Sequence, residues 1–269
     1  MRMVAALVWP AAFGASTDVP LTSGPKPETL EAFDRYIRLT ESVLEARLKD
    51  RDEFLWPETD AVTERLRHGA VTCGPRTGTG ETKVAHGLIE DWAGAVFIPG
   101  ATVGEVLRVV QDYDNHQKTY HHQVMRSRVL AHNRNDFKVY LRLLKRKVIT
   151  VVLDTEHEVH YRPLDEHRWQ SRSYSTRIQE IENQGRAAED AAQPKKDHGF
   201  LWRLNSYWMF TEKDGGVYVE CEAVSLSRNV PADLRWLLDP ILRSLPREAL
   251  AGTLRDTRDA LANRVTATP

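Results

Sequence analysis

Five segments in the second half of the chain alternate apolar with polar residues and are rich in β-branched and aromatic side chains, a pattern that favours β-strands. Most connections between these segments are short, and short connections place consecutive strands side by side. We therefore predict an antiparallel meander, which requires a fold built around one antiparallel sheet. The five segments span residues 136–144, 148–161, 168–182, 199–212 and 215–227.

The first hundred residues predict two helices and a hairpin ahead of this sheet. Residues 17–27 are rich in Pro, Ser, Thr and Gly and are predicted to form a linker. Apolar residues then recur at helical spacing over 27–52, and a second, short helix is expected after Pro57. Residues 69–99 predict a strand, a glycine-rich turn and another strand.

Helical patterns also occur just before the predicted meander and after it. Residues 102–112 carry Val and Leu at helical spacing, and Thr102 is a favourable residue for beginning a helix. The segment 183–198 interrupts the meander and is predicted to be a long polar loop. The C-terminal part of the chain is a helical run with one apolar stripe, made of Leu250, Leu254 and Leu261.

This order of elements resembles the START-like, Bet v 1-like superfamily, which also contains the polyketide cyclases. Two stretches carry the resemblance. In "GAVFIPGATVGEVLRVVQDYDNHQKTY" a strand ends at Pro-Gly and gives way to a helix followed by an Asp-Tyr turn, and "LSRNVPADLRWLLDPILRSLPREALAGTLRDTRDAL" closes the domain. The resemblance covers residues 69–264 and leaves 17–68 as a linker with an N-terminal helical extension.

The resemblance implies an α+β helix-grip fold, in which a curved antiparallel sheet wraps around a long C-terminal helix. It also implies a cavity between the sheet and that helix for an apolar ligand such as a lipid, a sterol or a polyketide. Resemblance of fold does not by itself assign a function.

The side-chain period of two in strands predicts which residues face this cavity. The same parity directs Glu220 and Glu222 outward. Large aromatic side chains that face small ones could equally fill the space as a packed core, because apolar strand faces alone do not distinguish the two cases. The predicted cavity residues are Val139, Leu141, Leu153, Thr155, His157, Tyr174, Trp202, Leu204, Trp208, Val219, Cys221, Leu250 and Leu254.

The stretch "QDYDNHQKTYHH", residues 111–122, is the densest group of metal-ligand side chains in the sequence. Its spacing does not fit a calcium loop, which needs Gly at the sixth position and Glu at the twelfth, and it lacks the HExxH of a zinc protease. We interpret it as a solvated turn after a helix, with its histidines in water. Tyr113 and Tyr120 would then face inward and gate the pocket.

Other candidate chemistry is weak. Glu156, Glu158 and His160 share one strand face and are predicted to form an outward charged row, and Arg177 is expected to pair on the surface. No GxSxG nucleophile motif occurs. His157 and Tyr174 could be posed as an acid–base pair, although a hydrogen-bonded core histidine is the favoured interpretation.

Composition limits the partners and the redox chemistry. Lys plus Arg (37) nearly equals Asp plus Glu (38), so no global field favours nucleic acid, and we expect no nucleic-acid partner. Cys73 and Cys221 are expected to be buried thiols, with a single bridge as the alternative. We expect no metal and no other cofactor.

The N-terminus, "MRMVAALVWPAAFGAS", has an early positive charge, an apolar run and small residues after it. These three features in this order predict a short secretory signal peptide over residues 1–16, and hence export. The apolar run is too short to span a bilayer, and we expect no transmembrane segment.

The sequence thus favours a protein that binds a hydrophobic small molecule or lipid between its sheet and its C-terminal helix, and possible transport follows from such binding. The first alternative is an enzyme of the polyketide cyclase or hydratase kind that uses acid–base groups of the cavity. The second is an envelope-associated interaction module without a ligand.

Overall fold

The structure is a computed structural model that describes residues 24–49, 59–146, 150–181, 199–229 and 245–265. The predicted signal peptide and the predicted polar loop over 183–198 lie outside the described residues. The elements are α1 (Pro27–Lys49), α2 (Asp60–Arg67), β1 (Thr72–Pro75), β2 (Glu81–Val84), β3 (Gly87–Pro99), α3 (Val103–Val110), the 3₁₀ turn η1 (Tyr113–Asn115), α4 (His116–Thr119), β4 (Val124–Asn133), β5 (Asp136–Arg146), β6 (Thr150–Pro163), β7 (Arg168–Ile181), β8 (Leu201–Lys213), β9 (Gly216–Arg228) and α6 (Leu245–Val265).

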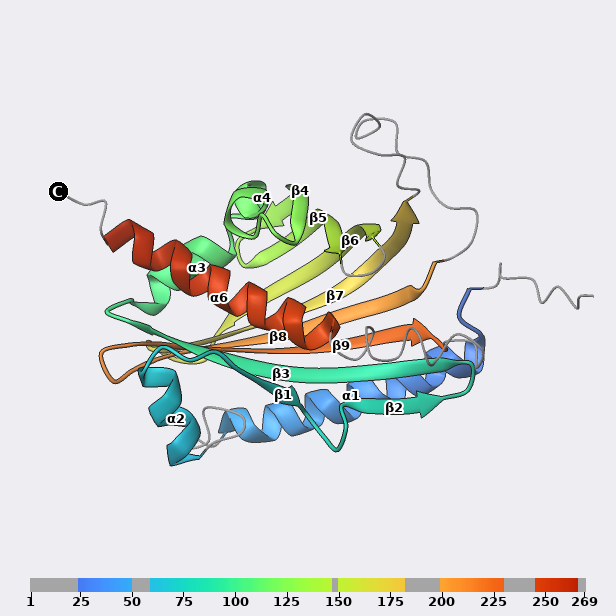
Figure 1. The fold of residues 1–269 in the computed structure, drawn as a ribbon, viewed down its shortest axis with the longest axis horizontal. Helices are drawn as coiled ribbons and strands as arrows, with labels where there is room; N and C mark the ends of the chain where they lie inside the picture. Colours follow the sequence, from blue (N-terminus) through green and yellow to red (C-terminus); the bar gives the residue numbers. More distant parts are fainter. Residues whose placement is uncertain (1–23, 50–58, 147–149, 182–198, 230–244, 266–269) are drawn as a thin grey trace, which may run out of the picture.

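All nine of these strands belong to one antiparallel sheet in the order β1-β3-β9-β8-β7-β6-β5-β4, and β2 also pairs with β3. The five predicted strands are β5 to β9, and they form the predicted meander. In Figure 1 the helix α6 crosses one face of the curved sheet, while α1 and α2 lie on the opposite face. The predicted α+β helix-grip fold is therefore confirmed.

The edge strand β4 was not predicted. Its register against β5 shifts between Val124 and Arg126 and again between Val129 and Ala131. Each shift breaks the alternation that a strand of period two would show in the sequence, and an edge strand buries little on either face. The sequence signal for β4 is therefore lost.

The face of the sheet that α6 covers is called the inner face. The C-terminal stripe was predicted correctly, since Leu250, Leu254 and Leu261 are buried in the core that α6 forms with α3 and the sheet. Helix α6 packs chiefly against β3, with further contacts to β1, β9 and α3. Gly94 of β3 allows the close approach, because a Cβ there would lie 2.9 Å from Leu254 Cδ1 and 2.5 Å from Cys73 Sγ.

The opposite, outer face is covered mainly by α1. Phe33 and Leu44 of α1 are buried in a second apolar cluster, although Val43, which the periodicity placed near the apolar stripe, is half exposed. This cluster also contains Ile89, Trp202, Tyr207, Met209, Val224 and Leu226 from the sheet. Helix α2 forms a third, smaller cluster with β3 and β9, and Thr59 caps its N-terminus. Among the described helices, none has the length and apolar character needed to cross a membrane.

The close approach of α6 to β3 gives a testable prediction. Gly94→Ala would place a methyl group against Leu254, Cys73 and the Thr72 carbonyl oxygen, so we expect it to lower the free energy of unfolding by about 1–3 kcal/mol. Gly104→Ala in α3 is the matched control, because a Cβ there meets nothing within 4 Å. The control should be neutral or stabilising by up to about 1 kcal/mol. Urea denaturation measures both, and equal stability of the two variants would contradict the packing.

Candidate functional site

The candidate site is the inner face of the sheet away from the closest contacts of α6. Strand pairing arranges its side chains in rows that run across the strands, since directly paired residues of antiparallel strands point to the same face. We call two of these rows the serine row and the polar row. The serine row is Trp92, Ala223, Ser206, Ser173, Val159 and Phe137. The polar row is Glu90, Ser225, Leu204, Ser175, His157 and Val139.

Polarity changes from row to row along the inner face. Nearest to α3, the paired residues Val96, Val219 and Phe210 are apolar and fully buried. The serine row lies further along the strands, and the polar row after it contains two ionisable groups, Glu90 and His157. The inner face is therefore apolar at one end and polar at the other, as is required for an amphipathic ligand.

Small side chains occupy the middle of both rows. Ser173 and Ser206 are directly paired, and both remain partly exposed although they lie on the inner face. The neighbouring Leu204 and Trp208 are partly exposed as well. Because a packed core would exclude solvent from such side chains, their exposure indicates that the inner face is incompletely filled here.

His157 is the most distinctive residue of the polar row. Its side chain is 5% exposed, and its Nδ1 lies 3.3 Å from Ser173 Oγ. Its Nε2 is buried and has no hydrogen-bond partner among the described residues. Burial lowers the pKa of His157 to about 4, so the ring is neutral at physiological pH. A neutral imidazole with a vacant nitrogen can hydrogen-bond to a polar group of a ligand.

Glu90 stands at the other end of the polar row and was missed by the sequence interpretation. The stretch "IEDW" puts two acidic residues side by side in a long apolar strand, with Glu90 on the inner face and Asp91 on the outer face. Burial, together with the charge of Glu81, raises the pKa of Glu90 to about 7. A substantial share of Glu90 is therefore protonated at neutral pH and can donate a hydrogen bond.

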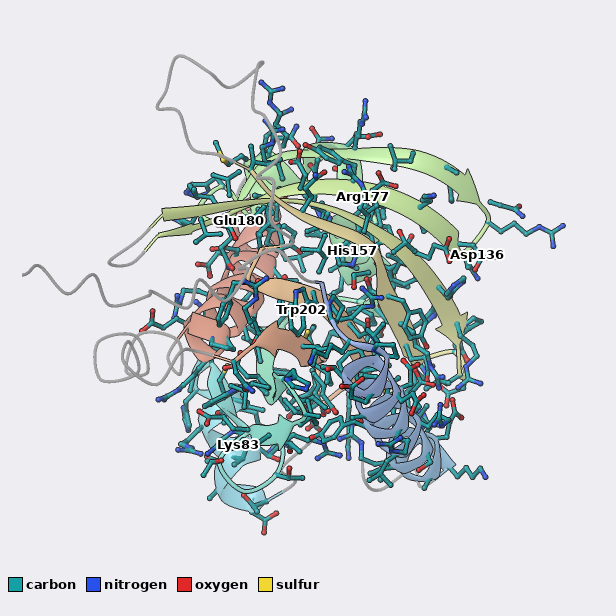
Figure 2. All side chains as sticks on the ribbon, turned by 90° about the vertical axis from the view of Figure 1, so that its right-hand side faces the viewer. Lys83, Asp136, His157, Arg177, Glu180 and Trp202 are labelled. Atoms are coloured by element: carbon teal, nitrogen blue, oxygen red, sulfur yellow. The ribbon has the colours of Figure 1, made fainter. Side chains whose placement is uncertain are left out.

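Most of the predicted cavity residues do lie on the inner face. Nine of them are in inner-face positions on the strands or on the sheet-facing side of α6, either buried or partly exposed, and Figure 2 shows His157 within the body of the molecule. Cys221 and Trp208, which are paired across β8 and β9, also lie on the inner face. The predicted residues that the structure places on this face are Val139, Leu141, Leu153, Thr155, His157, Leu204, Trp208, Val219, Cys221, Leu250 and Leu254.

Trp202 and Tyr174 were assigned to the wrong face. The register of β8 shifts between Leu201 and Arg203, so Trp202 is the extra residue of a bulge and packs in the outer cluster under α1. Tyr174 pairs with Glu158 on the outer face and donates a hydrogen bond to Glu41 of α1 at 2.7 Å. The acid–base pair posed between His157 and Tyr174 is therefore wrong, because the sheet separates the two side chains.

The predicted gate residues both point inward. The hydroxyls of Tyr113 and Tyr161 lie 2.8 Å apart in the inner core, and Tyr120 Oη lies 3.1 Å from Thr257 Oγ1 of α6. The prediction that the histidines of this turn stay in water is correct for His121 and His122, which are exposed. It is wrong for His116, which is buried.

His116 is buried because its ring packs between Tyr113 and Tyr120, and its Nε2 lies 3.1 Å from the Val110 carbonyl oxygen. The turn therefore contacts α3 through His116, which the sequence interpretation placed in solvent, and α6 through Tyr120, which it placed inside. Whether Tyr113 and Tyr120 gate a pocket stays a prediction.

Two further assignments concern charged and sulfur-containing residues. The outward charged row was predicted correctly, since Glu158 and His160 are exposed and Arg177 Nε donates to Glu156 Oε1 at 3.0 Å across the strands. Figure 2 shows Arg177 and Asp136 near the periphery of the sheet. Cys73 and Cys221 flank Gly94 on neighbouring strands and are free thiols, not a bridge.

Glu220 and Glu222 do point outward, as predicted, but not into solvent. Both are buried under α1, with exposures of 2% and 3%. The alternation of β9 was therefore predicted correctly, but the sequence did not predict that α1 covers this face of the sheet.

A separate surface hollow of about 380 Å³ lies at one end of the sheet, where the β8–β9 turn meets the start of α3. Its lining contains none of the predicted cavity residues. Glu212 contributes to it, but this carboxylate is already engaged, because its Oε2 accepts a hydrogen bond from the Val103 backbone N–H at 2.7 Å. The lining consists of Gly100, Ala101, Thr102, His167, Glu212, Lys213, Gly215 and Gly216.

The serines of the inner face were also missed, although the sequence contains a signal for them. Ser171, Ser173 and Ser175 alternate along β7 within "QSRSYST", so they occupy one face of that strand. Their face could have been assigned only by pairing β7 with its neighbours. The register places them opposite Tyr161, Val159 and His157, respectively.

No protein-family model matches the chain, and no curated protein matches it. Several solved structures do. The STAR-related lipid transfer protein from Xanthomonas axonopodis has 17% identity and a TM-score of 0.46, with 68% of this chain and 97% of that chain covered. The Zhui aromatase/cyclase from Streptomyces sp. R1128 has 11% identity and a TM-score of 0.48, with 66% and 97% covered.

Human STARD10 has 10% identity and a TM-score of 0.44, with 81% of this chain and 83% of that chain covered. The Xanthomonas match is named a lipid transfer protein and the Streptomyces match an aromatase/cyclase, and the sequence resemblance had named the START-like superfamily with its polyketide cyclases. At such low identity the similarity concerns the arrangement of the chain alone. It is the order of strands and the position of α6 that give this chain its helix-grip fold.

The buried carboxyl of Glu90 predicts a pH dependence of stability. Its pKa is about 7 in the folded chain and near 4.5 when exposed, so the folded state binds more protons between these values. Stability should therefore fall as the pH rises through this window and level off above it. Glu90→Gln should remove the loss of stability that ionisation of Glu90 causes. At pH 8 the variant should therefore be more stable than the unmodified protein by on the order of 1–3 kcal/mol.

Urea denaturation at pH 5, 6, 7 and 8 measures the effect as the difference between the variant and the unmodified protein. Glu158→Gln, which changes an exposed carboxylate, should leave the pH profile unchanged. Parallel profiles for Glu90→Gln and the unmodified protein would show that Glu90 ionises normally in the folded chain.

Proposed function

We propose that this protein binds an amphipathic small molecule, with a hydrophobic body and at least one oxygen function, on the inner face between the sheet and α6. The observation that carries the proposal is the buried Nε2 of His157, which has no partner among the described residues. A buried polar atom without a hydrogen bond costs about 1–3 kcal/mol, and a ligand group would remove that cost.

The change from apolar to polar rows along the inner face supports one orientation for the ligand. Its apolar body would lie against Trp208 and Leu204, which are partly exposed, and towards the apolar rows near α3. Its oxygen function would lie at the polar row, within reach of His157. Burial of the apolar body would supply most of the affinity, at roughly 25 cal/mol for each Å² removed from water, and the polar row would supply orientation.

The tautomer of His157 decides which polar group fits. If Nδ1 accepts a hydrogen bond from the Ser173 hydroxyl, then Nε2 carries the ring hydrogen and needs an acceptor from the ligand, such as a carbonyl oxygen. If Nδ1 donates to Ser173, Nε2 is an acceptor and requires a hydroxyl. Both arrangements fit a sterol-like, lipid-like or polyketide-like molecule, whereas neither is satisfied by a plain hydrocarbon.

Catalysis at the same site is the second candidate, and the neutral imidazole of His157 favours it. A buried, uncharged imidazole can take up a proton from a bound substrate, as the cyclase and hydratase alternative requires. Its partner cannot be Tyr174, which lies on the other face. Turnover of a polyketone that is lost in His157→Phe and retained in Glu158→Gln would decide for the enzyme.

Binding is tested by the molecule that stays with the purified full-length chain. Organic extraction followed by mass spectrometry should recover an amphipathic molecule with a carbonyl or hydroxyl group, in an amount comparable to the protein. Ser206→Phe should reduce that amount below about one tenth, because the larger ring would occupy the space at the centre of the serine row. His157→Phe should weaken binding about tenfold, the loss expected for one hydrogen bond of about 1.4 kcal/mol.

Glu158→Gln is the matched control for both variants, since Glu158 is the exposed sequence neighbour of His157. Thermal melting of each variant checks that it is folded. Recovery of no molecule above the level of a blank, or equal recovery from the unmodified protein and a folded Ser206→Phe variant, would count against the proposed site.

A further inference from the structure

A layer of buried charged residues lies on the outer face, between α1 and the sheet, and plays no part in the proposed site. We call it the outer carboxyl layer, and it consists of Arg47, Arg76, Asp91, Glu220 and Glu222. Arg47 Nη2 of α1 donates to Glu220 Oε1 of β9 at 2.6 Å, and the two side chains are only 8% and 2% exposed. Arg76 Nε, just after β1, lies 3.2 Å from Glu222 Oε2. Asp91 of β3 accepts a hydrogen bond from Tyr36 Oη of α1 at 2.9 Å.

The charges of this layer are unequal in number. It holds three carboxyl groups, and the cations that act on Asp91 and Glu222 are Arg76 and Arg47. Ionised carboxylates buried in an apolar interface need compensating charge, because desolvation of an unpaired ion is very costly. Among these five described residues, retention of one proton by a carboxyl would lower the electrostatic cost of burying three carboxyls beside two guanidinium groups.

The geometry indicates which carboxyls hold that proton. Asp91 and Glu222 are diagonal neighbours on the outer face, and the positive charge of Arg76 acts on both carboxyl groups. Two carboxyl groups can share a hydrogen bond only if one of them is protonated. In addition, Asp91 Oδ1 and Glu222 Oε1 are both buried and accept no hydrogen bond from another described group. A shared proton would satisfy one of these two oxygens.

The surroundings of the pair come from four elements or their ends. Helix α1 contributes Tyr36 and Arg47, the end of β1 contributes Arg76, and β9 contributes Glu220. Tyr207 of β8 is the cross-strand neighbour of Glu222, and its hydroxyl donates to Glu41 of α1 at 3.0 Å. Helix α1 thus covers the pair directly, so the charge of the pair acts on the attachment of α1 to the sheet.

We propose that the attachment of α1 to the outer face is linked to one proton shared by Asp91 and Glu222, so that α1 loosens when the proton is lost. This is a property of the outer face and does not depend on the proposed ligand site. It makes the N-terminal helix a proton-sensitive cover of the sheet.

The direction of the effect follows from linkage. Burial, together with the charge of Asp91, raises the pKa of Glu222 to about 8. When α1 detaches, Glu222 becomes solvated and its pKa returns towards 4.5. The attached state therefore binds more protons at every pH between these values. Detachment should become more favourable as the pH rises through this window, and should level off above about 8.

Hydrogen–deuterium exchange of the full-length chain between pH 6.5 and 9, corrected for the intrinsic exchange rate at each pH, tests this link. The protection of peptides from α1 should fall roughly tenfold per pH unit between 6.5 and 8, the slope for one linked proton, and then stay constant. Peptides from α6, on the inner face, should change much less.

Two variants remove the need for the proton in different ways. Glu222→Gln replaces the protonated carboxyl by a neutral amide of similar shape. Asp91→Asn leaves two carboxylates to balance Arg47 and Arg76. Both should keep α1 protected at pH 6.5 and reduce the slope below about twofold per pH unit. Because each is tested separately, failure of one variant to fold leaves the other as the test.

Glu158→Gln, an exposed carboxylate of the outer face, is the control and should keep the slope of the unmodified protein. The proposal is overturned if α1 and α6 lose protection in parallel. It is equally overturned if a folded Glu222→Gln or Asp91→Asn variant retains the full slope.

Discussion

Helices cover the central strands β3, β8 and β9 on both faces, and most other features of the structure follow from this constraint. A strand with one solvated face can place charges there freely, whereas a strand with two buried faces must pair or neutralise them. Helix α6 covers the inner face through Leu250 and Leu254, and α1 covers the outer face through Phe33 and Leu44. Every ionisable residue on these strands that lies beneath one of the helices must therefore be paired with an opposite charge or kept neutral.

The two faces meet this constraint differently. On the outer face, Glu220 and Glu222 are matched by arginines from α1 and from the end of β1, so the charges hold the N-terminal helix to the sheet. On the inner face, Glu90 and His157 have pKa values that burial shifts towards their neutral forms. Neutral polar groups on a partly open apolar face can orient a ligand, whereas paired charges serve attachment.

Sequence patterns predicted the strands well where the period of two was unbroken. The parity of β5, β6 and β9 was assigned correctly, which placed Val139, His157 and Cys221 on the inner face. The errors arose at irregularities. Trp202 was misplaced because the bulge in β8 reverses the parity ahead of it, and β4 was missed because two register shifts obscure its alternation. A bulge is a property of two paired strands, and it has no reliable signature in one.

The sequence by itself determined the α+β class, the antiparallel meander and the apolar stripe of the C-terminal helix, because these depend on periodicity within single segments. Only the tertiary structure decided that Glu222 is buried rather than solvated, that Tyr174 and His157 lie on opposite faces, and that Glu90 and His157 belong to the same row. These facts depend on which segments lie against one another. Segments far apart in the chain, such as α1 and β9, become neighbours through packing, which local patterns do not encode.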